Sequence, residues 1–337
     1  MTENRTWPIV IAEAGVNHNG SLDYAMRLVD IAAEAKADYV KFQTFKTENL
    51  VAKSCPTATY QQEKTGHGGQ YEMLKNLELS YNDFRELKDY CEHRGIGFLS
   101  TPFDIESVDF LASLKVDFMK IPSGEITNLP YLRRIASTGI PVIISTGMST
   151  IDEIGDALRP FRNTGYPADK IFLLHCNTQY PTPYQDVNLN ALTTLEKAFG
   201  VEVGYSDHTV GVEVPVAAVA LGAKIIEKHF TMSRELKGPD HSASLEPEEL
   251  KMMVSMIRNV NTALGSPEKF RTSSETGNLG IARKSIVASR KIVRGQIIQE
   301  EDLTTKRPGT GLSPMIWDRV VGSVATKDFM PDQQIEL

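Results

Sequence analysis

The sequence predicts a (β/α)8 barrel, also called a TIM barrel, followed by a small β-rich domain. Three observations predict it. Short apolar runs recur between residues 9 and 231 and end in polar residues, and segments of helical periodicity stand between most of them. After residue 265 the composition shifts to Ser, Thr, Gly and charge, and short β-branched runs follow.

The apolar runs are interpreted as eight strands, and Ser21, Ser80 and Asn128 are candidate N-caps of the helices between them. Strands that alternate with helices pair in parallel through right-handed crossovers, and eight such units close into a barrel. An open doubly wound sheet is the alternative. It is disfavoured because no G-x-G-x-x-G motif opens a helix after the first strand, and because polar residues end every run. The runs cover residues 9–15, 39–45, 96–104, 117–125, 141–149, 171–181, 201–209 and 224–231.

The remaining segments are assigned from composition. Residues 46–78 form a long, polar, Gly-containing insert, which we expect to be a loop over the barrel mouth. A last helix is predicted over residues 247–265. We therefore expect a barrel domain over residues 1–265, a linker over 266–281 and a compact β-rich domain over 282–337.

Charge and cysteine usage exclude several classes of function. The 337 residues include 36 Lys and Arg against 43 Asp and Glu, a net charge of -7 that disfavours nucleic acid or an anionic membrane as a partner. Cys55, Cys91 and Cys176 show no C-x-x-C spacing, and no signal region or apolar run of membrane-spanning length occurs. The expected location is a reducing cytoplasm.

Histidines at the strand ends point to a metal site. Polar residues at the carboxyl ends of barrel strands share one mouth, and Asn17 and His18 after the first run belong to it. His208 and His229 end the seventh and eighth runs, which places two imidazoles within reach of one divalent cation. His175, inside the apolar LLHC, is expected to be structural.

Two lysines within apolar runs point to an anionic ligand. Lys41 and Lys120 would be buried there, and a buried ammonium needs an anionic partner. That partner is either a phosphate or carboxylate of a ligand, or a strand-end carboxylate such as Glu13 or Glu125. Hydroxyl donors at the same level favour a small doubly anionic ligand; they are Ser123, Ser145 and Ser206.

Two other classes use a barrel of this kind. A Schiff-base aldolase would need one desolvated lysine, and the histidine pair would then be superfluous. A non-catalytic sugar-binding barrel would not explain so many charged groups at one mouth. Lysines and histidines together favour metal-assisted carbonyl chemistry.

A set of motifs covering nearly all of the chain resembles the sialic acid synthase family, which condenses phosphoenolpyruvate with an N-acylated mannosamine-type sugar to make nonulosonic acids. The motifs occur in the family's order: IAEAGVNHNG, VKFQTF, FLSTPFD, KIPSGEI, ISTGM, LLHCNTQYPTPY, GYSDHT, IEKHFT, GPDHSASLEP, ARKSIVA and TTKRPGTG.

The resemblance implies an antifreeze-like (SAF) C-terminal domain and a homodimer in which this domain caps the partner's barrel. It implies that His208 and His229 bind Mn2+ or Mg2+. The positions that match phosphoenolpyruvate contacts are Lys41, Lys120, Ser123, Ser145, Thr178 and Ser206, with Asn177 a second candidate because the Asn177-Thr178 order departs from some members. Those that match the sugar site are Gln43, Glu125, Tyr180, Asp240 and, from the other subunit, Arg307. Glu13 matches a position near the reacting carbons. The expected catalytic residues are Glu13, Lys41, Lys120, Glu125 and Tyr180.

The expected reaction is condensation of phosphoenolpyruvate, N-acetylmannosamine and water to N-acetylneuraminate and phosphate, with cleavage of the C-O bond. The alternative is an N,N'-diacetyllegionaminate synthase, whose acceptor is 2,4-diacetamido-2,4,6-trideoxymannose. The two sugars differ at carbons 4 and 6, and contacts to those carbons are expected from residues 46–78.

Overall fold

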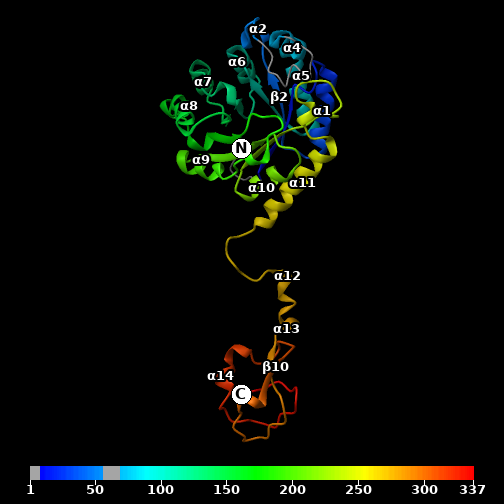
Figure 1. The fold of residues 1–337 in the computed structure, drawn as a ribbon, viewed down its shortest axis with the longest axis vertical. Coiled ribbons are helices and arrows are strands. Elements are labelled where there is room, and N and C mark those ends of the chain that lie inside the picture. The colour runs from blue at the N-terminus through cyan, green and yellow to red at the C-terminus, as the bar shows by residue number, and fades with distance from the viewer. Residues whose placement is uncertain (1–7, 56–68) are drawn as a thin grey trace. The chain divides into compact units, whose positions relative to one another are not determined.

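The computed structural model describes residues 8–55 and 69–337, and the chain divides into two compact units, Met1–Gly265 and Ser266–Leu337. In the first unit, the helices surround the strands (Figure 1). None of the helices in the described part of the chain combines the length and apolar composition that a membrane crossing requires.

Eight parallel strands form the first unit's sheet, in the order β3-β2-β1-β8-β7-β6-β5-β4. The two end strands, β3 and β4, pack against each other, so the sheet closes into a barrel. This confirms the predicted (β/α)8 fold. The strands are β1 (Ile9–Gly15), β2 (Tyr39–Thr44), β3 (Gly97–Pro102), β4 (Met119–Ile121), β5 (Val142–Ser145), β6 (Ile171–Cys176), β7 (Glu202–Asp207) and β8 (Ile225–His229).

The helices begin where side chains can bond their first free N–H groups. Ser21 accepts from the N–H of Tyr24, Ser80 forms a capping box with Asp83, and Asn128 caps the third predicted helix. All three predicted N-caps are confirmed. The helices of this unit are α1 (Leu22–Glu34), α2 (Thr47–Leu50), α4 (Gln70–Leu77), α5 (Tyr81–Arg94), α6 (Ile105–Ser113), α7 (Leu129–Ala136), α8 (Ile151–Asn163), α9 (Ala191–Phe199), α10 (Glu213–Ala220) and α11 (Pro247–Leu264).

The insert over residues 46–78 is more ordered than expected. It contains α2 and α4, so a loop is the wrong description of these parts, while residues 56–68 lie outside the described chain. Met73 and Leu77 of α4 stand four residues apart on one helix face and pack with Val16 and Phe45. This small apolar cluster holds the helix beside the end of β2.

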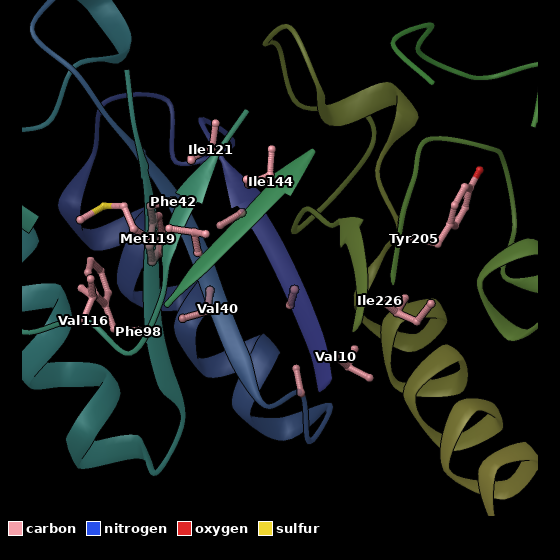
Figure 2. Packing of buried hydrophobic residues seen from close by; sticks show 14 of the residues in the cluster. Val10, Val40, Phe42, Phe98, Val116, Met119, Ile121, Ile144, Tyr205 and Ile226 are labelled. Atoms are coloured by element: carbon pink, nitrogen blue, oxygen red, sulfur yellow. The ribbon is translucent and has the colours of Figure 1, made fainter. Parts of the chain in front are cut away.

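Two apolar layers follow from the alternation of side chains along the strands. Val10 and Ala12 of β1 face outward into the large cluster between strands and helices, part of which Figure 2 shows. Ile9 and Ile11 face inward and join Tyr39, Leu99 and their neighbours in a second cluster that fills the barrel's interior. The inward apolar residues lie early in the strands, so the carboxyl ends remain for polar side chains.

The second unit is small and β-rich. Its strands β9 (Ser285–Ala288) and β10 (Leu303–Lys306) pair antiparallel, and isolated bridges such as Ile292 with Phe329 extend the pairing. Its core contains Ile286, Ile292, Val320 and Phe329. The segment expected as a linker carries two short helices, α12 (Ser273–Thr276) and α13 (Leu279–Ala282), and α14 (Trp317–Val320) lies later.

Candidate active site

A polar cavity of about 210 Å³ lies among the carboxyl ends of the strands. Its lining continues the inward side of each strand. On β2, for example, Lys41 and Gln43 stand two and four residues after the inward Tyr39, and on β8 Glu227 and His229 stand two and four after Ile225. The lining residues are Glu13, Lys41, Gln43, Thr101, Phe103, Lys120, Pro122, Ser123, Gly124, Ser145, Met148, Cys176, Thr178, Tyr180, Ser206, His208, Glu227 and His229.

Two buried lysines and two buried carboxylates form the floor of this cavity. Lys41 Nζ lies 2.7 Å from Glu13 Oε2 and 3.5 Å from Glu227 Oε2, and Lys120 Nζ lies 3.6 Å from Glu227 Oε1. Ser206 Oγ donates to Glu227 Oε1 at 2.9 Å. The lysines therefore pair with strand-end carboxylates, and the shared partner is Glu227 rather than Glu125.

Burial and charge act in opposite directions on these groups. Burial raises the pKa of Glu13 to about 7, against the lowering effect of Lys41. Burial also opposes ionisation of Glu227, but Lys120 and Lys41 outweigh it and lower the pKa of Glu227 to about 2. Burial lowers the pKa of Lys120, whereas for Lys41 the two carboxylates outweigh burial and raise the pKa. Glu227 is thus the fixed negative charge between the two lysines.

His208 and His229 lie side by side above this floor, with ring centroids 5.6 Å apart. The Tyr180 ring is 4.0 Å from the His208 ring and 5.6 Å from the His229 ring. Burial lowers the pKa of His208 to about 4 and moves the pKa of His229 well below its usual value. Burial likewise raises the pKa of Tyr180 well above its usual value, with the charge of Asp240 adding to the effect.

The histidine pair fits a divalent cation. His208 Nδ1 lies 2.5 Å from the carbonyl oxygen of Asn177, which as an acceptor requires the proton on Nδ1 and leaves Nε2 as a ligand atom. Among the described residues, His229 Nδ1 is buried without a hydrogen-bond partner. Both rings are neutral near pH 7, as metal ligands must be. Within residues 8–55 and 69–337 no three His, Cys, Asp or Glu side chains cluster as a metal site, so the protein would supply two ligands and leave positions open.

Several residues assigned from the sequence lie away from the cavity lining. Glu125 accepts from Asn128 Nδ2 at 2.6 Å on the short turn after β4. Asn177 lines a separate cavity of about 520 Å³, so Thr178 is the one of the two that reaches the polar site. Asp240 acts on the site through its charge near Tyr180.

Asn17 and His18 were expected at the barrel mouth, but they do not line the cavity. Asn17 Nδ2 donates to the carbonyl of Phe230 and to Ser244 Oγ, which ties the loop after β1 to the loop after β8. The N–H of Gly20 donates to His18 Nδ1. These side chains hold loops in place because β1 and β8 are neighbours in the barrel.

Arg307 belongs to the second unit, where its Nε donates to the carbonyl of Ala282 at 3.0 Å. The contact assigned to Arg307 from the sequence is with the sugar in the site of a partner subunit, and it stays a prediction.

Glu227 is the central residue to which the sequence analysis gave no role, although it lies near the end of the eighth run with His229. A signal for it existed, since Glu227 stands two residues before His229 and so shares its inward face. Its partners come from β2, β4 and β7, and only the closed barrel brings these strands together.

A model of the NeuB family matches residues 28–269, and a model of the SAF domain matches residues 283–336. The chain is 48% identical over 328 residues to the N,N'-diacetyllegionaminic acid synthase of Campylobacter jejuni subsp. jejuni serotype O:2, covering 97% of this chain and 98% of the relative. It is 50% identical over 318 residues to the synthase of that name from Legionella pneumophila, covering 93% of this chain and 89% of the relative. A solved N-acetylneuraminic acid synthetase from Leptospira borgpetersenii serovar Hardjo-bovis matches with a TM-score of 0.72 at 36% identity, covering 81% and 90%.

The chain therefore belongs to the NeuB family. The expectations of an enzyme of the sialic acid synthase family and of a barrel joined to a SAF domain are confirmed. For the acceptor sugar, the relatives support the legionaminate alternative better than the first expectation of N-acetylneuraminate.

Proposed function

We propose that this enzyme condenses phosphoenolpyruvate, 2,4-diacetamido-2,4,6-trideoxymannose and water to N,N'-diacetyllegionaminate and phosphate. The chemistry rests on one observation, the buried pair of lysines around Glu227 beside the neutral histidine pair. The choice of acceptor rests on the two relatives of that name at 48% and 50% identity. N-acetylmannosamine is the second candidate because the 36% identical solved structure is a sialic acid synthetase.

In this proposal the lysines bind phosphoenolpyruvate. Within the part of the chain that the structure describes, Lys120 has one carboxylate partner, at 3.6 Å, and its Nζ donates to Ser145 Oγ at 2.8 Å, so its charge is available to the ligand. Lys41 contributes a second cation. Hydroxyl groups complete the set of donors for phosphate and carboxylate oxygens; they belong to Ser123, Ser145 and Thr178, which line the cavity. Ser206 also lines it, but its hydroxyl donates to Glu227.

Tyr180, Gln43 and the histidine pair would orient the acceptor over carbon 3 of phosphoenolpyruvate. His208 and His229 would hold Mn2+ or Mg2+, and a cation there supplies Lewis-acid polarisation of a carbonyl oxygen. Tyr180 packs on both imidazoles and so lies beside the position proposed for the sugar. Asp240 would add a charged acceptor contact, consistent with its influence on Tyr180.

The bond changes in the proposal balance without a further reactant. Carbon 3 of phosphoenolpyruvate forms a bond to the aldehyde carbon, water adds at carbon 2, and the bond from carbon 2 to the bridging oxygen breaks as phosphate leaves. Glu13 is the carboxyl group placed to move a proton between water and the new hydroxyl. Its Oε2 lies 2.7 Å from Lys41 Nζ, and Glu13 stands opposite His229 in the register of β1 and β8.

The test is side-by-side turnover of both acceptors with phosphoenolpyruvate and Mn2+. We expect kcat/KM to be at least tenfold higher for the diacetamido sugar; the reverse preference would make the chain an N-acetylneuraminate synthase. Oxygen-18 in the bridging position should leave in phosphate, and its retention in the sugar acid would exclude C-O cleavage. A lysine adduct trapped by borohydride would instead support a Schiff-base aldolase.

A further inference from the structure

A second buried ion pair lies on the outer side of the barrel strands that carry the histidines. Lys228 Nζ bonds Asp207 Oδ2, and the two side chains are only 1% and 0% exposed. They face away from the cavity, since Ser206, His208, Glu227 and His229 line it and side chains alternate along a strand. The charges of Glu213 on α10 and Glu249 on α11 also act on Lys228, which places it toward the helix layer.

The pair sits at the last matched position of the two strands. Asp207 pairs with Lys228 across β7 and β8, and the next residues along the chain are His208, directly after β7, and His229, the last residue of β8. No ladder bond holds the strands together beyond this point in the described chain. The ion pair is therefore the last direct connection before the two imidazoles.

Lys228 also fixes the backbone after His208. Its Nζ donates to the carbonyl oxygen of Thr209 at 2.6 Å. The N–H and hydroxyl of Thr209 donate to the two Asp207 carboxylate oxygens at 3.1 and 2.9 Å. His208 is thus enclosed between two residues that both bond Lys228, and its Nδ1 bonds the carbonyl oxygen of Asn177.

We propose that Lys228 and Asp207 are positioning residues for the metal site, which fix the backbone at His208 and thereby its spacing from His229 and the approach of its Nδ1 to the carbonyl oxygen of Asn177. The proposal rests on the histidine pair as the metal ligands of the proposed function. A buried charge that loses its partner moves toward water or recruits another group. Asp207 without Lys228 would do this at the position adjacent to His208, and the outer partners of metal ligands commonly control affinity.

The test is a titration of the metal-free, full-length chain with Mn2+ in the absence of both substrates. The electron paramagnetic resonance signal of free Mn2+ measures how much of the metal is bound. Lys228→Met keeps the apolar stem of the side chain and removes the charge. We expect its Kd for Mn2+ to rise by about 10- to 100-fold. Asp207→Asn removes the charge but keeps one oxygen that can accept from the N–H of Thr209, so a smaller loss is expected.

A second readout reports the imidazoles directly. Proton-nitrogen correlation spectra of the metal-free chain should show His208 with its proton on Nδ1 in the parent. In Lys228→Met this tautomer should give way to a mixture. A purely structural role elsewhere would leave this signature unchanged.

Arg258→Met is the control because it breaks a different ion pair, a partly buried one with Asp38 at 2.7 Å before the amino end of β2. It should lower thermal stability and leave the Mn2+ affinity within twofold of the parent. A parent-like Kd and tautomer in folded Lys228→Met would overturn the proposal, as would an equal affinity loss in Arg258→Met or a parent that binds no Mn2+. If Lys228→Met does not fold, Asp207→Asn decides by the same criteria. Since no substrate is present, a wrong acceptor assignment leaves this result unaffected.

Discussion

Lys120→Met separates ligand binding from stability more clearly than other changes in the cavity. The Lys120 side chain is 3% exposed, and its partners are Ser145 Oγ at 2.8 Å and Glu227 at 3.6 Å. A phosphate oxygen about 4 Å from this ammonium gains about 4 kcal/mol at an effective dielectric constant of about 20. Since about 1.4 kcal/mol is a tenfold change, the Kd for phosphoenolpyruvate should rise about a thousandfold.

The stability of this variant should fall much less than its ligand affinity. Breaking a buried ion pair by removing one partner costs about 3–5 kcal/mol when a charge is left unpaired. Glu227 keeps Lys41 at 3.5 Å and the Ser206 hydroxyl at 2.9 Å, so no charge is left unpaired and we expect a loss well below that range. Burial also lowers the pKa of Lys120, which shows that this ammonium is itself costly to bury.

Calorimetric titration of phosphoenolpyruvate measures the affinity, and urea unfolding measures the stability. Ligand bound only to the folded state raises stability by RT ln(1 + [L]/Kd), so phosphoenolpyruvate should stabilise the parent and not the variant. Arg258→Met serves as the control with lowered stability and an intact cavity. A Kd for Lys120→Met within threefold of the parent would refute the assignment of this lysine to the anion.

Three further outcomes test other parts of the molecule. Gly147→Ala places a Cβ 2.8 Å from Ser123 Oγ, so it should weaken phosphoenolpyruvate binding in calorimetry; unchanged binding would contradict the proposed hydroxyl contact. Burial lowers the pKa of His18 to about 4, so between pH 6.5 and 4 the unfolded chain binds more protons than the folded chain, and stability decreases as the pH is lowered. His18→Gln should reduce this slope, measured by urea unfolding, by about 1.4 kcal/mol per pH unit. If Arg307 completes a partner's site, inactive Arg307→Ala and Lys41→Met chains should recover about a quarter of parental turnover when mixed and refolded, whereas no recovery would place both groups in one chain's site.

Local patterns in the sequence were sufficient for the elements of the barrel. Ser21, Ser80 and Asn128 cap their helices as predicted because an N-cap depends on bonds over three residues. The strands were predicted too long at their carboxyl ends. The run over residues 117–125 contains a strand of only Met119–Ile121, since Pro122 has no N–H for the ladder and a turn begins there.

The sequence by itself determined the barrel, the inward lysines and the two histidines, because side-chain alternation along a strand is a local property. Only the tertiary structure decided that Glu227 joins both lysines, that Thr178 rather than Asn177 reaches the cavity, and that Asn17 holds a loop. These facts depend on strand register and loop conformation. Both arise from contacts between segments far apart in the chain, which no pattern within one segment specifies.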